Sequence, residues 1–130
     1  MKAEDSLTIS VANYLRLQYP TVLFTHIANE RKTNKRKNPK TGRWYTPEGN
    51  KLKRMGVQPG MPDIMIFKPH LKDHIDFISA GLFLELKIGK NRPTEHQKST
   101  MEKLIDNLWV GAVCYSFDEA KKEIDNYLKS

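Results

Sequence analysis

The segment from Leu82 to Ile88, with the sequence LFLELKI, constrains the fold of this chain more than any other stretch. Its apolar residues predict a buried β-strand, but it also contains Glu85 and Lys87, and charged side chains are costly to bury without a partner. Side chains two positions apart in a strand project to the same face. Glu85 and Lys87 therefore point together, while the leucines and Ile88 point the other way. The segment predicts a strand with one apolar face and one face that carries a carboxylate and an amine.

A second apolar run, IMIF at residues 64–67, begins directly after Asp63 and predicts a neighbouring strand. A carboxylate from that strand, together with Glu85 and Lys87, forms a candidate site for a divalent cation and a phosphate. That combination suggests metal-dependent cleavage of a phosphodiester. The bare spacing also fits a simpler interpretation, an exposed ion pair between Glu85 and Lys87 on an edge strand with Asp63 in a turn.

Hydrophobic periodicity predicts the remaining regular elements. Apolar residues recur at helical spacing over residues 4–18, and residues 21–27 and 109–115 are expected to be strands. Two further helices are expected after Thr94 and Ser116, because Thr94 with Gln97 and Ser116 with Glu119 have capping-box spacing. The expected apolar stripes are Met101, Leu104, Ile105 and Leu108 in the first of these helices and Ala120, Ile124, Tyr127 and Leu128 in the second.

Two segments show little periodicity. Residues 29–60 are rich in Asn, Pro, Gly, Lys and Arg and are expected to form a long loop with a hairpin around residues 40–42. Residues 69–81 are expected to be a polar connection. The predicted order of elements is therefore α-β-β-β-α-β-α, an α/β fold. The chain is expected to be a single domain over residues 1–130, with a basic loop at residues 30–60.

The net charge of +7 is concentrated in one segment. Residues 30–54 contain ten Lys or Arg and two acids, so this segment carries +8 and the rest of the chain −1. Such a basic block indicates a contact surface for a polyanion, although a solvated loop has the same composition. Trp44 and Tyr45 lie within it and either stack on bases or pack the loop onto the body. The candidate nucleic-acid contacts are Arg31, Lys32, Lys35, Arg36, Lys37, Arg43, Lys51, Lys53 and Arg54.

The composition narrows the class of protein further. Cys114 is the one cysteine, which excludes an intrachain disulfide and fits a reducing compartment. No apolar run approaches the roughly 18 residues that a bilayer crossing needs. The first six residues lack the apolar core of a signal peptide. We therefore expect a cytoplasmic protein, with Cys114 in the core.

The residues that carry the candidate chemistry occur in a recognisable order. They are Gly60-Met61-Pro62-Asp63, Glu85-Leu86-Lys87, and Gln97 at the start of the following helix. In this order the chain resembles the PD-(D/E)XK nuclease superfamily, and within it the small stand-alone VRR-NUC domains typical of phages and prophages. Glu4, Asn29-Glu30 and Lys53-Arg54-Met55-Gly56 are also similar to that family, whereas a small or branched apolar residue is more usual at Met61.

The resemblance implies a restriction-endonuclease-like core with a mixed four-stranded sheet flanked by helices. In such a site Asp63 and Glu85 would bind Mg²⁺ or Mn²⁺, with the backbone carbonyl of Leu86 as a third ligand. Lys87 would orient the attacking water or stabilise the charge that develops on the phosphate.

Three more residues have both a functional and a structural interpretation. Families of this type place an acid from the first helix at the metal, which makes Glu4 a candidate, yet Glu4 and Asp5 are also favourably placed at a helix amino terminus. The resemblance places Gln97 at the rim of the site, while its capping-box spacing explains it structurally. His26 is either a satisfied strand histidine or a contact to substrate at the end of the first strand.

The resemblance implies a divalent-metal-dependent endonuclease that acts on DNA, in a phage or its bacterial host. Two phosphodiester cuts need two sites, so we expect a homodimer that acts on branched, Holliday-junction-like DNA. Two alternatives stay open: a nucleic-acid-binding module that keeps the fold without catalysis, and a nuclease directed at RNA.

Overall fold

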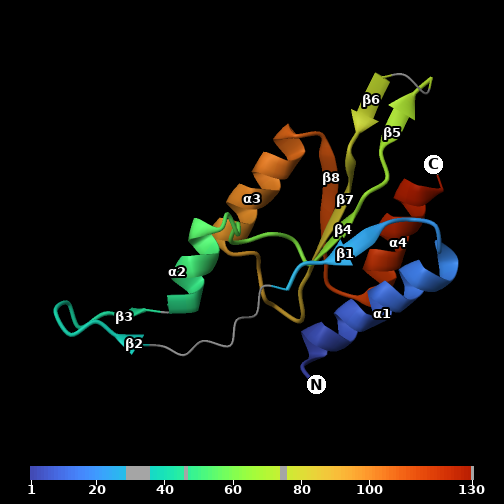
Figure 1. The fold of residues 1–130 in the computed structure, drawn as a ribbon. Helices are drawn as coiled ribbons and strands as arrows, with labels where there is room; N and C mark the ends of the chain where they lie inside the picture. Colours follow the sequence, from blue (N-terminus) through green and yellow to red (C-terminus); the bar gives the residue numbers. More distant parts are fainter. Residues whose placement is uncertain (29–35, 46, 74–75, 130) are drawn as a thin grey trace.

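The computed structural model describes residues 1–28, 36–45, 47–73 and 76–129 (Figure 1). Four helices and eight strands lie in these ranges. The helices are α1 (Ala3–Gln18), α2 (Pro47–Arg54), α3 (Glu95–Asp106) and α4 (Phe117–Leu128). The strands are β1 (Phe24–His26), β2 (Arg36–Lys37), β3 (Trp44–Tyr45), β4 (Ile64–Ile66), β5 (His70–Lys72), β6 (Asp76–Ser79), β7 (Gly81–Leu86) and β8 (Trp109–Cys114). None of the described helices combines the length and the apolarity that crossing a membrane requires.

A four-stranded mixed sheet in the order β1-β4-β7-β8 forms the centre of the fold. β1 pairs with β4 and β4 with β7 in antiparallel fashion, and β7 pairs with β8 in parallel. Ile64 of β4 lies opposite Leu84 of β7, so continuing the register by one residue brings Asp63 opposite Glu85. The predicted mixed sheet is confirmed, and its register places the two candidate carboxylates at the same end.

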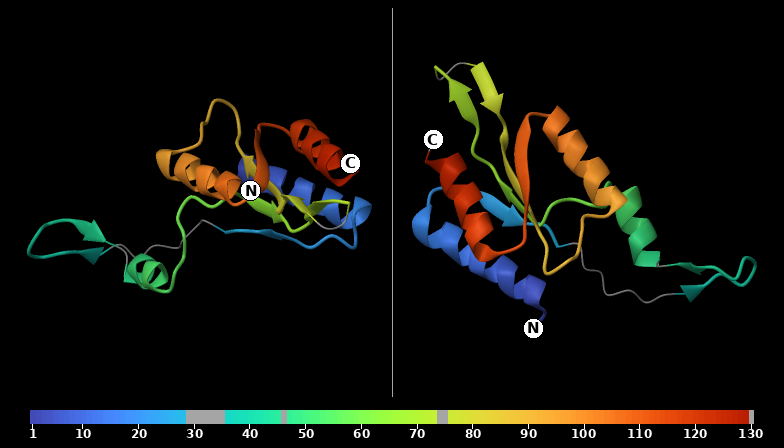
Figure 2. Two further views of the ribbon diagram at one scale, coloured as in Figure 1. Left: turned by 90° about the horizontal axis from the view of Figure 1, so that it is seen from above. Right: turned by 180° about the vertical axis from the view of Figure 1, so that it is seen from behind.

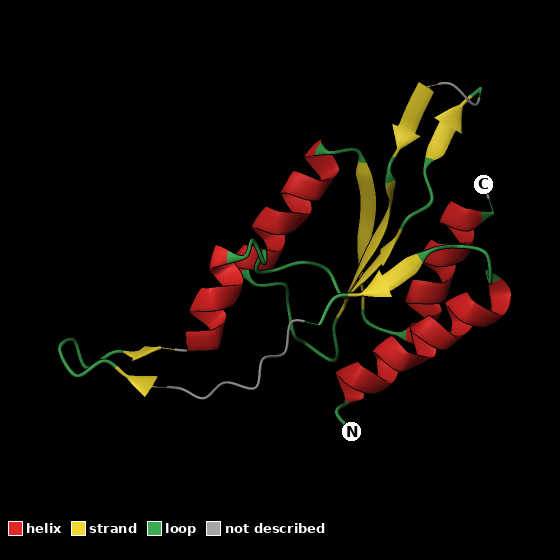
Figure 3. Ribbon diagram, in the orientation of Figure 1, coloured by secondary structure: helices red, strands yellow, loops and turns green. Residues whose placement is uncertain are grey.

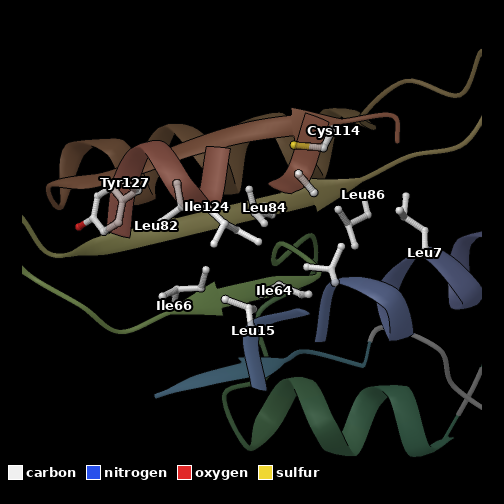
Figure 4. Packing of buried hydrophobic residues seen from close by; sticks show 12 residues of the cluster. Leu7, Leu15, Ile64, Ile66, Leu82, Leu84, Leu86, Cys114, Ile124 and Tyr127 are labelled. Carbon is white, nitrogen blue, oxygen red and sulfur yellow. The ribbon is translucent and has the colours of Figure 1, made fainter. Parts of the chain in front are cut away.

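Helices cover both faces of this sheet (Figures 2 and 3). α1 and α4 pack together over one face, where the leucines of β7 meet Leu15 and Ile124 in a fully buried core (Figure 4). The helix α3 lies over β8 on the other face, the side to which Phe83 points. The side chains of β7 therefore alternate as predicted.

The apolar stripe expected on α3 is only partly buried. Met101 and Leu104 are half-buried, but Ile105 and Leu108 are 56% and 51% exposed, so the expectation is wrong for the second half of the stripe. The buried residue of this helix is Thr100, whose hydroxyl donates to the Pro59 carbonyl at 2.9 Å. The helix rests on the segment before β4 as well as on the sheet. Leu108 lies after the helix end at Asp106, and its carbonyl accepts from the Ala80 amide at 2.8 Å while its side chain is exposed.

The two segments without periodicity contain short elements that the sequence did not predict. The expected hairpin near residues 40–42 is confirmed as β2–β3, but α2 follows it, with Pro47 at the first helical position that suits proline. Residues 69–81 are not a plain connection, because β5 and β6 form a second hairpin that extends β4 and β7. The first strand is also shorter than expected, at Phe24–His26.

Candidate active site

Asp63 is held by three contacts at the start of β4. Its backbone carbonyl accepts from the amide of Ile27 at 2.9 Å and from Nδ1 of His26 at 2.8 Å. Its carboxylate Oδ2 accepts from the amide of Leu86 at 2.7 Å. The neighbouring strands β1 and β7 therefore fix both the backbone and the side chain of this half-buried aspartate.

Glu85 lies inside the sheet with only 1% of its surface exposed. Its Oε1 accepts from Nε2 of Gln97 at 3.2 Å and lies 3.6 Å from Nζ of Lys87. Within the described residues, its Oε2 is the buried side-chain polar atom that has no hydrogen-bond partner. Such an orphaned oxygen is rare in folded proteins because leaving it unpaired is costly.

The surroundings of Glu85 favour its neutral form. Burial is the main cause that raises the pKa of Glu85 to about 8, and repulsion from the Asp63 carboxylate raises it further. Lys87 lowers this pKa, but its ammonium does not offset burial. Two converging carboxylates, one of them buried and partly unpaired, form the kind of oxygen donor set that a hard divalent cation binds.

The edge-strand interpretation of Glu85 and Lys87 is wrong. β7 lies between β4 and β8, and Lys87, like Glu85, is buried, with 8% of its surface exposed. Lys87 donates its amide to the Cys114 carbonyl at 2.9 Å, so the β7–β8 pairing continues through this residue. The pair belongs to the interior of the sheet.

Gln97 makes both contacts that the sequence suggested, one that caps α3 and one to a residue of the candidate site. Thr94 and Gln97 form a capping box, with the Thr94 amide donating to Oε1 of Gln97 at 2.8 Å and the Gln97 amide donating to Oγ1 of Thr94 at 3.2 Å. The remaining amide group, Nε2, donates to Glu85. One side chain therefore caps α3 and holds the buried carboxylate.

A cavity of about 280 Å³ opens beside these residues. It is lined by Lys2, Glu4, Asp5, Thr8, His26, Ala28, Asp63 and Gln97. The structure thus brings Glu4 from α1 to the same cavity as Asp63. Among the described residues, however, no three or more His, Cys, Asp or Glu side chains are grouped closely enough to hold a metal ion, so Glu4 does not complete such a group with Asp63 and Glu85.

No protein-family model and no curated protein matches this sequence. Among solved structures, the chain is similar to one described as a "VRR_NUC domain protein", with a TM-score of 0.69 and 24% sequence identity over 99% of this chain and 90% of that chain. The chain has the VRR_NUC fold. At this identity the likeness concerns the fold, and at that level the resemblance drawn from Pro62-Asp63, Glu85-Leu86-Lys87 and Gln97 is confirmed.

On the VRR_NUC fold of this chain, His26 lies at the end of β1 and contacts the backbone of Asp63. A carbonyl oxygen only accepts hydrogen bonds, so Nδ1 of His26 carries the hydrogen that it shares with Asp63. The ring lines the cavity, which makes it a candidate substrate contact. Sequence reasoning placed His26 at the end of the first strand, but the pairing of β1 with β4 is what brings it to Asp63.

Two sets of residues that line hollows of the surface were not predicted from the sequence. Thr8 lies one helical turn after Glu4, and that spacing alone would have placed it on the same face of α1. An open hollow of about 710 Å³ is lined by Tyr115 and by three residues that follow Lys87 closely in the chain, Gly89, Lys90 and Arg92. The closeness of Lys90 and Arg92 to Lys87 in the sequence was the available signal.

The basic candidates fall into two groups. Those within the described residues are exposed and lie on β2, on the hairpin turn or on α2: Arg36, Lys37, Arg43, Lys51, Lys53 and Arg54. Arg31, Lys32 and Lys35, together with Asn29-Glu30, lie outside the described residues. The hairpin and α2 extend away from the sheet (Figures 1 and 2).

Proposed function

We propose that this protein is a divalent-metal-dependent endonuclease that hydrolyses DNA phosphodiester bonds. The observation that carries the proposal is the carboxylate pair on the VRR_NUC fold, in which Glu85 is buried with an unpartnered oxygen beside Asp63. Asp63 and Glu85, with the backbone carbonyl of Leu86, would hold Mg²⁺ or Mn²⁺. Such an ion, when bound, polarises a phosphate and makes a water molecule more acidic.

The chain's own residues supply the rest of the site. Lys87 places a buried positive charge beside Glu85, where it would orient the attacking water or stabilise charge on the phosphate. Gln97 fixes the Glu85 carboxylate through Nε2, so that its free oxygen keeps one orientation. Glu4 and His26 line the adjoining cavity and would contact either the metal's water shell or the substrate.

The substrate that we propose is branched DNA, cut by a homodimer in the cytoplasm of a bacterium or a phage-infected cell. Exposed cations on β2, on the hairpin turn and on α2 provide a surface for the phosphate backbone. Within the described residues, one chain brings together one pair of proposed site carboxylates, so cutting both strands would need two copies. The outer face of α1 offers apolar surface for such a contact, since Ile9 is 46% and Leu17 78% exposed.

The test is a cleavage assay with Mg²⁺ or Mn²⁺ on four-way junctions, flaps, nicked and linear duplexes, and RNA of matched sequence. We expect cleavage that chelation abolishes and that Asp63→Asn and Glu85→Gln reduce by orders of magnitude. Lys87→Met should lose rate but keep its affinity for Mn²⁺ in a calorimetric titration. Glu95→Gln is the matched control, because the Glu95 side chain is 93% exposed.

The outcomes separate the alternatives. Binding without cleavage under all metals would favour the inactive binding module, and preferential cleavage of RNA would favour the RNA-directed nuclease. Wild-type turnover in either carboxylate variant would refute the metal assignment. Light scattering gives the mass: a strict monomer that cuts linear duplex as fast as a junction would refute the dimer and its branched substrate while leaving the chemistry intact.

A further inference from the structure

The β2–β3 hairpin, residues 36–45, is a defined two-stranded ribbon (Figure 1). Asn38 closes its turn: the Asn38 amide donates to the Arg43 carbonyl at 2.8 Å, and its side-chain oxygen accepts from the amides of Lys40 and Thr41 at 2.8 and 3.3 Å. Gly42 supplies the positive φ of 71° that the turn requires. The ribbon is therefore held by its own hydrogen bonds.

The aromatic residues of the ribbon do not pack onto the body of the protein. Trp44 is 65% exposed and Tyr45 is 40% exposed, which decides against the interpretation that they pin the segment to the sheet. An indole is a large apolar group, and leaving it in water forgoes a substantial gain from burial. The exposed indole on this projecting ribbon leaves a flat apolar face available to a partner.

The charges around Trp44 and Tyr45 identify the kind of partner. Residues 36–54 contain seven Lys or Arg and one acid, and all seven basic residues are exposed. In the ribbon register Lys37 lies opposite Trp44 and Arg36 lies opposite Tyr45, so each aromatic ring has a cation beside it. Aromatic rings among exposed cations suit a polyanion that also presents flat faces, which describes nucleic acid.

The segment that connects the ribbon to β4 is anchored next to the candidate active site. The ribbon continues through α2 into residues 55–62, which pack against the start of α3. Gly60 approaches the backbone of His96 so closely that a Cβ atom would lie 2.6 Å from its carbonyl oxygen, and Pro59 accepts from Thr100 at 2.9 Å. Asp63 follows this anchored segment directly, so α2 and residues 55–62 are the connection between the ribbon and the candidate metal ligand.

We propose that the ribbon recognises unpaired bases in DNA, with Trp44 stacking on a base and Lys37, Arg36 and Arg43 contacting the flanking phosphates. The inference rests on the proposed function for DNA as the substrate, and it assigns the preference for branched DNA to particular residues. In a continuous duplex the base faces are covered by their neighbours, so an indole reaches a face only where pairing is interrupted. Stacking on an aromatic side chain tolerates every base, which suits selection by DNA structure without a fixed sequence.

The experiment measures the tryptophan fluorescence of the full chain as DNA is added. Divalent metal is left out, so that binding is observed without cleavage. The chain has two tryptophans, and Trp109 is half-buried with its ring 5.5 Å from that of Phe67. Titration with single-stranded or gapped DNA should quench the Trp109→Phe variant, in which Trp44 is the sole tryptophan. The Trp44→Phe variant is the matched control and should show no such quenching. Equal quenching by a continuous duplex would overturn the proposal in favour of groove contacts.

Affinity provides the second arm. Trp44→Ala should weaken binding to gapped DNA about 10- to 100-fold, as expected for the loss of one stacked base, and leave duplex affinity within about 2-fold. Trp44→Phe should retain most of the affinity. Equal losses for both DNAs, or stronger quenching by RNA than by DNA of the same sequence, would overturn the proposal. A protein that cuts DNA without a change in Trp44 emission refutes this inference alone, whereas quenching without cleavage refutes the nuclease function alone.

Discussion

Replacing Glu85 by Gln should stabilise the protein in the absence of divalent metal. Glu85 is buried to 1% exposure, its Oε2 has no partner, and the Lys87 ammonium stands 3.6 Å away, beyond the 2.7–2.9 Å of a close charged hydrogen bond. Glutamine has the same shape and carries no charge to bury. The substitution should remove the free-energy cost of placing an ionisable carboxyl group at this buried position. Under the proposed function, it should also remove the cleavage activity.

The size of the gain follows from the pKa of Glu85. Burial, and then the Asp63 carboxylate, raise this pKa from its ordinary 4.5 to about 8. Between those values the unfolded chain has released the proton that the folded chain still holds, so each pH unit above 4.5 lowers the free energy of unfolding by about 1.4 kcal/mol. At pH 7 this gives an upper bound of about 3 kcal/mol, and relaxation around the charge reduces it, so we expect Glu85→Gln to gain about 1–3 kcal/mol.

Urea unfolding followed by circular dichroism, from pH 5 to pH 8 with a chelator, measures this gain. It should be small near pH 5, which lies only half a unit above the ordinary pKa of 4.5, and grow as the pH rises toward 8. Glu95→Gln should change stability by less than about 0.5 kcal/mol at every pH. A Glu85→Gln variant that is less stable than wild type at pH 7, or a gain that does not depend on pH, would refute the reasoning.

Three further substitutions or measurements test the surrounding structure. Gly60→Ala should lower the free energy of unfolding in urea by about 2–4 kcal/mol and reduce cleavage, because the added Cβ would press on the first turn of α3. Gly42 has a similar positive φ but no atom within 4 Å of an added Cβ, so Gly42→Ala should cost only about 1 kcal/mol. Equal costs for the two variants would contradict the close approach of Gly60 to α3. Asp125 accepts from the hydroxyls of Tyr14 and Tyr19 at 2.5 and 2.6 Å; burial opposes its ionisation, but these bonds and Lys121 hold its pKa below the ordinary range. Asp125→Asn should therefore cost about 1–2 kcal/mol at pH 7, with a difference from wild type that shrinks as the pH falls below 4, and a constant difference would contradict it. Burial also raises the pKa of the Cys114 thiol to about 12, so a thiol reagent should label it only at the rate of unfolding, and rapid labelling of the native protein would place it outside the core.

The parts of the fold that the sequence predicted depend on local rules. Thr94 and Ser116 begin their helices through hydrogen bonds to residues three positions later, so the spacing alone located both starts. The alternation in residues 82–88 located β7 and separated its two faces. The elements that were missed are short: α2 has 8 residues, β5 has 3 and β6 has 4, which is too few for a periodic signal.

The site was predictable as a set of residues but not as an arrangement. That Asp63 lies opposite Glu85 follows from the β4–β7 register, and that His26 reaches Asp63 follows from the β1–β4 pairing; both pairings join segments distant in the chain. The capping box of Gln97 was visible in the sequence, whereas its contact to Glu85 depends on where α3 lies over the sheet. The roles of these residues in catalysis and metal binding stay predictions.

Gln97 gives the clearest link between the architecture and the chemistry proposed for it. A glutamine that only capped α3 would leave its amide nitrogen in solvent, and a glutamate that only paired with Lys87 would place both oxygens near the ammonium. Instead, Oε1 of Gln97 accepts the helix-cap hydrogen bond and Nε2 donates to Glu85. The other oxygen of Glu85, Oε2, stays unpaired inside the protein. The capping box fixes the Gln97 side chain at the start of α3. The hydrogen bond from Nε2 therefore holds the buried Glu85 carboxylate in one orientation toward Asp63. The fold therefore keeps, where two carboxylates meet, a carboxyl group whose ionisation is destabilising, as the proposed cation site requires and as a structural ion pair would avoid.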